Sequence, residues 1–147
     1  MELKSLSSEL SVTAQLSIED VAKAAALGFK ALINNRPDGE SCCQPEASAL
    51  ASEAIANGLD YRHIPVVGGK ISDADVAAFS LALDQMTGPV LAFCRSGKRS
   101  TILWALSQAQ NVDPDQLIEV AKRAGYTISE LKARLEARAA APSSGTV

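Results

Sequence analysis

The chain has 147 residues, of which 47% are apolar and 21% are charged, and its formal net charge is −3. This length fits one domain that buries a core without disulfides or structural metal, and the acidic balance excludes the basic surface that binding to nucleic acid requires. No apolar run reaches membrane-spanning length and the first residues lack the layout of a signal peptide, so we expect a cytoplasmic protein with no membrane partner.

Strands and helices are predicted to alternate along the chain. In chain order the sequence predicts a strand over Leu10–Leu16, a helix over Ile18–Leu27, a strand over Phe29–Ile33, a loop over Asn34–Glu40, a helix over Glu46–Asn57, a strand over Leu59–Val66, a helix over Ser72–Met86, a strand over Val90–Phe93, and helices over Ser100–Ala109, Asp113–Gly125 and Thr127–Ala140. Serine or threonine followed three residues later by an acidic residue marks several helix starts, and glycine marks several ends.

This alternation predicts an α/β fold in which helices flank a mainly parallel central sheet. We expect a single domain over residues 1–138 and, over residues 139–147, a disordered tail or linker. Sites in such sheets form at the carboxyl ends of the strands. The loops that follow Ile33, Val66 and Phe93 should therefore lie on one rim and build the site.

Cys94 is the predicted nucleophile. It directly follows an apolar strand and precedes a helix, whose N-terminal amides and dipole stabilise a thiolate. Arg95, Lys98 and Arg99 add positive charge, and Gly97 lets the backbone turn its amides inward as an anion-binding nest. Together these residues predict a cradle that holds an anionic group against the sulfur.

Other polar residues near this rim are weaker candidates. The hydroxyls of Ser96 and Ser100 are expected to donate hydrogen bonds to the thiolate. Arg36 and Asp38 lie in the loop after the second predicted strand, where they either orient the substrate or form a salt-bridged turn. His63 is expected to be structural.

The cysteines and the histidine indicate neither a metal site nor a cofactor. Cys42 and Cys43 are adjacent, Cys94 is distant in sequence, and His63 is the one histidine, so no zinc-binding spacing is present. An odd number of cysteines in a reducing compartment argues against a disulfide framework. Cys42 and Cys43 are interpreted as an incidental pair, the alternative being that they accept sulfur from Cys94.

Three segments, in this order, resemble the beta-lactamase-hydrolase-like (Blh) phosphatase-like family. They are residues 33–40 (Ile-Asn-Asn-Arg-Pro-Asp-Gly-Glu), residues 63–66 (His-Ile-Pro-Val) and residues 93–100 (Phe-Cys-Arg-Ser-Gly-Lys-Arg-Ser). The resemblance implies a cysteine-phosphatase-like fold related to that of dual-specificity protein phosphatases. Some members are interpreted as rhodanese-type sulfurtransferases, and the resemblance further implies a persulfide dioxygenase as a partner or fused domain.

Two features bear on the choice between phosphatase and sulfurtransferase. In cysteine phosphatases five residues separate the cysteine from the phosphate-binding arginine, whereas here Ser100 occupies that position and Arg99 precedes it. Phosphatases of this fold usually protonate the leaving group with an aspartate after the Pro-Val strand. Residues 65–70 contain no aspartate, and Asp38 is the substitute that the rim offers.

The sequence therefore favours a sulfurtransferase. Cys94 would take sulfane sulfur from thiosulfate or a small persulfide and pass it, as a cysteine persulfide, to a thiol acceptor. Arg99 is the predicted catalytic partner. The predicted substrate-binding residues are Arg95, Ser96, Gly97, Lys98, Ser100, Arg36 and Asp38. Two alternatives stay open: a cysteine-dependent phosphatase with a phosphocysteine intermediate, and a non-catalytic domain that binds oxyanions.

Overall fold

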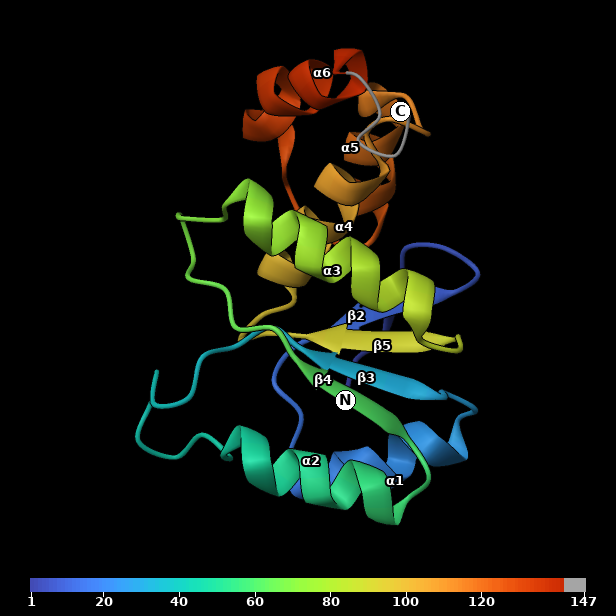
Figure 1. Ribbon diagram of the computed structural model, residues 1–147, viewed down its shortest axis with the longest axis vertical. Coiled ribbons are helices and arrows are strands. Elements are labelled where there is room, and N and C mark those ends of the chain that lie inside the picture. The colour runs from blue at the N-terminus through green and yellow to red at the C-terminus, as the bar shows by residue number, and fades with distance from the viewer. Residues whose placement is uncertain (142–147) are drawn as a thin grey trace.

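The computed structural model describes residues 1–141 and contains a five-stranded, mainly parallel sheet (Figure 1). The strands are β1 (Lys4–Ser5), β2 (Leu10–Thr13), β3 (Ala31–Asn34), β4 (Asp60–His63) and β5 (Val90–Phe93). Their order across the sheet is β1-β2-β5-β3-β4. β1 runs antiparallel to β2, and the other neighbouring strands are parallel. The predicted α/β fold with a mainly parallel sheet is confirmed.

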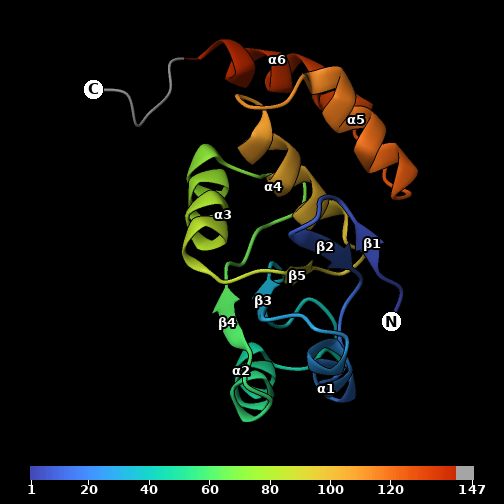
Figure 2. The ribbon, with the colours of Figure 1, turned by 90° about the vertical axis from the view of Figure 1, so that its right-hand side faces the viewer.

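Helices cover both faces of this sheet. They are α1 (Ile18–Ala26), α2 (Ala47–Ala56), α3 (Asp73–Gln85), α4 (Lys98–Gln108), α5 (Pro114–Arg123), the 3-10 helix η1 (Ser129–Leu131) and α6 (Lys132–Ala140). α1 and α2 pack on one face, and α3 to α6 lie on the other (Figures 1 and 2). No helix described within residues 1–141 combines the length and apolar composition needed to cross a bilayer.

The two central strands supply both apolar layers, because successive side chains of a strand point to opposite faces. Leu32, Leu91 and Phe93 pack into the cluster that includes residues of α1 and α2. Ile33 and Ala92 pack into the cluster that includes residues of α3 and α4. The apolar run of β5 is thus buried on both sides, as the sequence predicts for a central strand.

Two helix starts follow the predicted serine–aspartate spacing. At the start of α1 the amide of Asp20 donates to Ser17 Oγ (3.1 Å) and the amide of Ser17 donates to Asp20 Oδ2 (3.0 Å). Ser72 and Asp75 form the same reciprocal pair at the start of α3. Each pair satisfies two amides that would otherwise lack partners inside the helix.

The strand boundaries differ from the predictions. The predicted strand from Leu10 ends at Thr13, and the one from Leu59 is regular only over Asp60–His63. Beyond His63 the amides of Ile64 and Val66 still donate to the carbonyls of Asn34 and Asn35. β3 starts and ends later than predicted and includes Asn34. β1 was not predicted at all, since two residues carry no recognisable alternation.

The C-terminal helices also differ from the predictions. α4 begins at Lys98 rather than Ser100. Thr127 does not cap the last helix; the 3-10 turn η1 is preceded by Ile128 and has no side-chain cap. α6 extends to Ala140, so most of the tail expected over 139–147 lies outside the described residues.

Candidate active site

The loop between β5 and α4 places Cys94 at the N-terminal end of a helix. Cys94 is almost fully buried, with 1% of its surface exposed. Its Sγ accepts a hydrogen bond from the amide of Gly97 at 3.1 Å. Gly97 is the N-cap residue of α4, so the sulfur lies at the N-terminal end of this helix. A thiolate at this position is stabilised both by that amide and by the helix dipole.

Gly97 adopts a backbone conformation that other residues rarely take, with φ of 97°. A Cβ atom on Gly97 would overlap the hydroxyl of Tyr126 and lie 3.3 Å from the carbonyl of Thr13. The Tyr126 hydroxyl in turn donates to the carbonyl of Ser96 at 2.9 Å. The loop around Cys94 is therefore held from outside by a side chain of the C-terminal segment, and only glycine fits at its turn.

We expect Gly97→Ala to lower the free energy of unfolding by about 1 to 3 kcal/mol, from backbone strain and the displacement of Tyr126 together. Gly28→Ala is the matched control, because Gly28 has φ of 98° and a Cβ added to it would meet no atom within 4 Å. Urea denaturation of both variants separates the two contributions. An equal loss in the two variants would mean that contact with Tyr126 contributes nothing.

Ser100 lies under the loop and holds it to the neighbouring strand. It is fully buried, and its hydroxyl donates to Asn35 Oδ1 at 2.8 Å. Asn35 Nδ2 donates to the carbonyl of Ile64 at 3.0 Å. A hydroxyl has one proton to donate, so in this structure the Ser100 proton goes to Asn35 rather than to the thiolate. Ser100 ties α4 to the loops that follow β3 and β4.

Arg99 is fixed beside the sulfur by a carboxylate to which the sequence assigned no role. Its Nη1 and Nη2 each donate to Glu40 at 2.8 Å, and Nη1 also donates to the carbonyl of Val66 at 2.8 Å. The pKa of the Arg99 guanidinium is raised, first by the hydrogen bonds to Glu40 and further by the nearby Cys94. Glu40 takes the edge formed by the two Nη atoms, and Nε donates no hydrogen bond to an oxygen atom of residues 1–141.

Arg36 is a second arginine that contacts Glu40. It is buried, its Nε donates to Glu40 Oε1 at 2.8 Å, and its Nη1 donates to Gln15 Oε1 at 3.1 Å. The Arg36 carbonyl lies 2.8 Å from His63 Nε2. Of the two interpretations of Arg36, the structure thus places it in an ion-paired turn. We call the chain of contacts Arg36–Glu40–Arg99 the arginine clamp.

Asp38 contacts the start of α2. Its Oδ1 accepts a hydrogen bond from the amide of Ala47 at 2.8 Å and so caps α2, whose own N-cap residue, Glu46, makes no side-chain cap. Asp38 is therefore a structural cap, and the sequence-based suggestion that it replaces the missing acid finds no geometric support.

The carboxyl of Glu40 has a strongly lowered pKa. The hydrogen bonds from Arg99, and then those from Arg36, lower the pKa of its carboxyl from 4.5 to about 2. Glu40 is thus a carboxylate at neutral pH and has no proton to give. The sequence signal that could have found it is its position four residues after Arg36, in a loop that already held two site candidates.

We expect Glu40→Gln to lower the free energy of unfolding at neutral pH by about 1 to 2 kcal/mol, a value reduced for the partial solvent exposure of the clamp. Because the folded pKa is depressed, this contribution is complete above pH 4.5 and disappears as the pH falls toward about 2. Unfolding measured across this range should show the wild-type and variant curves converging. A difference that does not change with pH would contradict the role of the carboxylate charge.

The remaining predicted site residues stay near the loop surface. Arg95 is exposed, and its carbonyl accepts from the amide of Gln15 at 3.2 Å. Ser96 Oγ accepts from the amide of Lys98 at 3.3 Å, while Lys98 Nζ pairs with Glu130 at 3.4 Å. Arg95 and Ser96 belong to the loop itself and Lys98 begins α4; among residues 1–141 none of the three forms a hydrogen bond with Cys94 Sγ.

Cys42 and Cys43 are exposed, free thiols whose sulfurs lie 3.4 Å apart. They belong to the loop that carries Glu40, between β3 and α2. No contact between this pair and Cys94 is seen among residues 1–141. The geometry gives no support for sulfur transfer from Cys94 to this pair.

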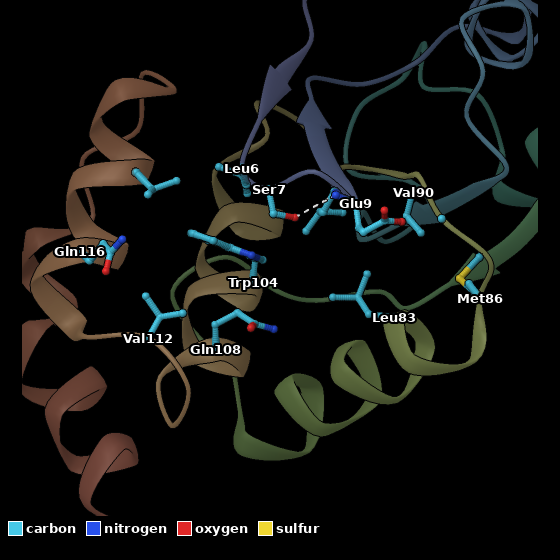
Figure 3. Close-up of a pocket in the computed structure, with 13 residues that line it drawn as sticks. Leu6, Ser7, Glu9, Leu83, Met86, Val90, Trp104, Gln108, Val112 and Gln116 are labelled. Carbon is cyan, nitrogen blue, oxygen red and sulfur yellow. Dashed lines mark hydrogen bonds between the residues drawn. The ribbon is translucent and has the colours of Figure 1, made fainter.

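Two cavities flank β5 at opposite ends. One, of about 500 Å³, adjoins the loop at Ser96 and Arg99. The other, of about 460 Å³, lies near Val90 and Trp104 at the start of β5 (Figure 3). Its lining is mainly apolar, with Glu9 as its one charged residue. An anionic substrate is therefore expected in the first cavity, which borders the Cys94 loop.

Comparisons with known proteins agree with this geometry. The family model for the phosphatase-like domain of beta-lactamase hydrolase-like proteins matches residues 2–111. A beta-lactamase hydrolase-like protein of Agrobacterium fabrum is 34% identical over 143 residues, which cover 96% of this chain and 33% of that protein. One from Xylella fastidiosa is 36% identical over 108 residues, covering 74% and 25%. The chain thus spans a quarter to a third of these relatives.

Solved structures give the same fold. A proposed phosphatase of Neisseria meningitidis superposes with a TM-score of 0.84 at 32% identity, covering 94% of this chain and 99% of that one. The core catalytic domain of a PP-IP phosphatase from S. cerevisiae has a TM-score of 0.67 at 15% identity, covering 91% and 83%. The second likeness concerns the fold alone. The predicted cysteine-phosphatase-like fold is confirmed.

Proposed function

Because the chain belongs to the family of phosphatase-like domains of beta-lactamase hydrolase-like proteins, we propose that it hydrolyses phosphate monoesters through a phosphocysteine at Cys94. The observation that carries the proposal is the joint placement of a buried thiol, a helix N-terminus and a fixed guanidinium. This arrangement supplies a nucleophile and donors for the oxygens of a phosphoryl group. The sequence alone favoured sulfur transfer, and the comparisons favour the phosphatase instead.

The proposed reaction has two displacements. The Cys94 thiolate attacks phosphorus, a P–S bond forms, and the P–O bond to the leaving group breaks with its electron pair on oxygen. Water then attacks the phosphocysteine, the P–S bond breaks, and inorganic phosphate and the thiolate are released. The amides at the start of α4 and the open edge of Arg99 are the proposed donors to the equatorial oxygens.

Four residues separate Cys94 from Arg99, one fewer than in other cysteine phosphatases. We propose that the arginine clamp compensates for this shorter spacing by holding the guanidinium in place. Glu40 and the carbonyl of Val66 hold the two Nη atoms, so the guanidinium is fixed without help from substrate. Because the guanidinium is already oriented before the substrate binds, no entropy is lost in orienting it during the reaction.

Within the described part of the chain, the site has no evident side chain to protonate the leaving group of the first displacement. The segment from Ile64 to Ser72 contains no carboxylic acid, Asp38 caps α2, and Glu40 is ionised at neutral pH. We therefore propose that the leaving oxygen departs as an anion or takes its proton from water. Substrates with acidic leaving groups, such as aryl phosphates, are the favoured class.

A series of aryl phosphates with increasingly basic leaving groups tests this proposal. We expect kcat/KM to fall steeply along the series, because little proton transfer accompanies P–O cleavage. Alkyl phosphates should be the poorest substrates. If kcat/KM did not depend on leaving-group basicity, a general acid would be protonating the leaving group, and the proposal that no side chain does so would be wrong. Absence of phosphate release from every substrate would overturn the function itself.

The same missing acid favours sulfur transfer as a second candidate. Sulfite leaving thiosulfate, or a thiolate leaving a small persulfide, is a stable anion and needs no proton. Cys94 would then carry a persulfide and pass the sulfur to a thiol acceptor, with a persulfide dioxygenase as the proposed partner or fused domain. Incubation with thiosulfate tests this candidate, since it requires one additional sulfur on Cys94.

A further inference from the structure

The cavity of about 500 Å³ beside the Cys94 loop combines positive charge with an apolar wall. Four cationic side chains line it, and Glu130 is its one carboxylate. The cations are Lys70, Lys98, Arg99 and Arg134. The chain as a whole carries a net charge of −3, so this excess of cations is local to the cavity and not a property of the whole surface.

Part of this charge is available to a ligand. Lys98 and Glu130 pair at 3.4 Å, but their side chains are about half exposed, and such pairs are easily replaced. Arg134 pairs with Asp73 at 3.0 Å, yet Asp73 also serves Arg138. The single negative charge of Asp73 is therefore shared by Arg134 and Arg138, so this group of three side chains keeps a net positive charge.

Lys70 is the least engaged of the four cations. It is exposed, and its ammonium makes no ion pair or hydrogen bond with any residue in the part of the chain that the structure describes. It stands in the loop between β4 and α3, close to Gly68, where an added Cβ would lie at van der Waals distance from the Arg99 side chain. The unpaired ammonium of Lys70 thus belongs to a loop that contacts Arg99, the residue that we propose binds the phosphoryl group.

The apolar part of the cavity comes from three partly buried side chains. They are Ile71, Ile102 and Leu131, all packed against the larger core cluster. Because these side chains are anchored in the core, they form a fixed surface rather than a flexible one. A ring or a short hydrocarbon segment placed on them would be removed from water.

We infer that this cavity holds the leaving-group side of the substrate and selects phosphate esters whose apolar body carries a second oxyanion, a carboxylate or another phosphate. The inference rests on the proposed function, since it places the reacting phosphoryl group at Cys94 and Arg99. The apolar body lies on Ile71 and Leu131, and the second oxyanion meets Lys70 and Lys98. Charge complementarity of this kind also speeds the encounter with the substrate.

A pair of aryl phosphates provides the test: 2-naphthyl phosphate and its analogue with a carboxylate on the far ring. We expect kcat/KM to be about 5- to 10-fold higher for the carboxylated substrate at low ionic strength. Lys70→Gln should reduce this ratio at least about twofold, and Glu130→Gln, which frees Lys98, should raise it. Lys23→Gln is the control, because Lys23 is an exposed lysine of α1 on the opposite face of the sheet.

Binding of both compounds to the Cys94→Ser variant, measured by calorimetry, gives the same comparison without turnover. A wild-type protein that releases no phosphate, while Cys94→Ser binds the carboxylated compound more tightly, would overturn the proposed function and leave the cavity assignment supported. Equal affinities and equal kcat/KM values, unchanged by Lys70→Gln and Glu130→Gln, would overturn the cavity assignment alone.

Discussion

Cys94→Ser should remove phosphate release almost completely, by at least about a thousandfold in kcat. Serine is slightly smaller than cysteine, so it should fit the buried position of Cys94. The hydroxyl does not ionise under these conditions, however, so the variant lacks the nucleophile. Phosphate release from an aryl phosphate, measured together with the free energy of unfolding, separates loss of chemistry from loss of fold.

Cys42→Ser and Cys43→Ser are the matched controls for this experiment. Both residues are exposed, and both lie in the loop between β3 and α2. Each control variant should keep the wild-type rate. Turnover by Cys94→Ser comparable to that of the wild type would remove the nucleophile from the mechanism.

Arg99→Lys should lower kcat/KM by about 100- to 1000-fold, although it preserves the charge. The guanidinium donates to Glu40 with one edge. In the proposed mechanism its Nε and Nη2 donate to the phosphoryl oxygens. Lysine has a single ammonium and cannot serve both sides in this fixed geometry. Steady-state kinetics should show most of the loss in kcat, because the contact is strongest in the transition state.

Arg123→Lys is the control for Arg99→Lys. Arg123 is an exposed arginine of α5 that pairs with Glu119 at 3.2 Å. This substitution should leave kcat and KM unchanged. If Arg99→Lys proved as active as Arg123→Lys, positive charge alone would suffice and the bidentate role of Arg99 would be wrong.

The parts of the fold that follow local chemistry could be predicted from the sequence. Val90–Phe93 is apolar at every position, and that pattern identified the central strand and placed Cys94 at its carboxyl end. Ser17 and Ser72 identified helix starts through the acids that follow them. In each case the signal lies within a few residues, where sequence spacing and spatial proximity coincide.

The contacts that organise the site could not be predicted in this way. Glu40 reaches Arg99 across 59 residues, and Ser100 reaches Asn35 across 65. Asp38 had the right residue type and the right loop for an acid, yet its carboxylate turns to cap α2. These contacts depend on how the loops after β3, β4 and β5 pack together at one edge of the sheet. A local sequence pattern carries no information about that packing.

The identity of the group carried by Cys94 tests the central claim most directly. Wild-type protein is mixed with an aryl phosphate, quenched within the first turnovers, digested and analysed by mass spectrometry; a parallel sample receives thiosulfate. We predict one phosphoryl group on the peptide that contains Cys94, absent from Cys94→Ser. Phosphate release without that adduct, or a stable additional sulfur on Cys94 from thiosulfate with no phosphoryl group from any aryl phosphate, would contradict the proposed mechanism.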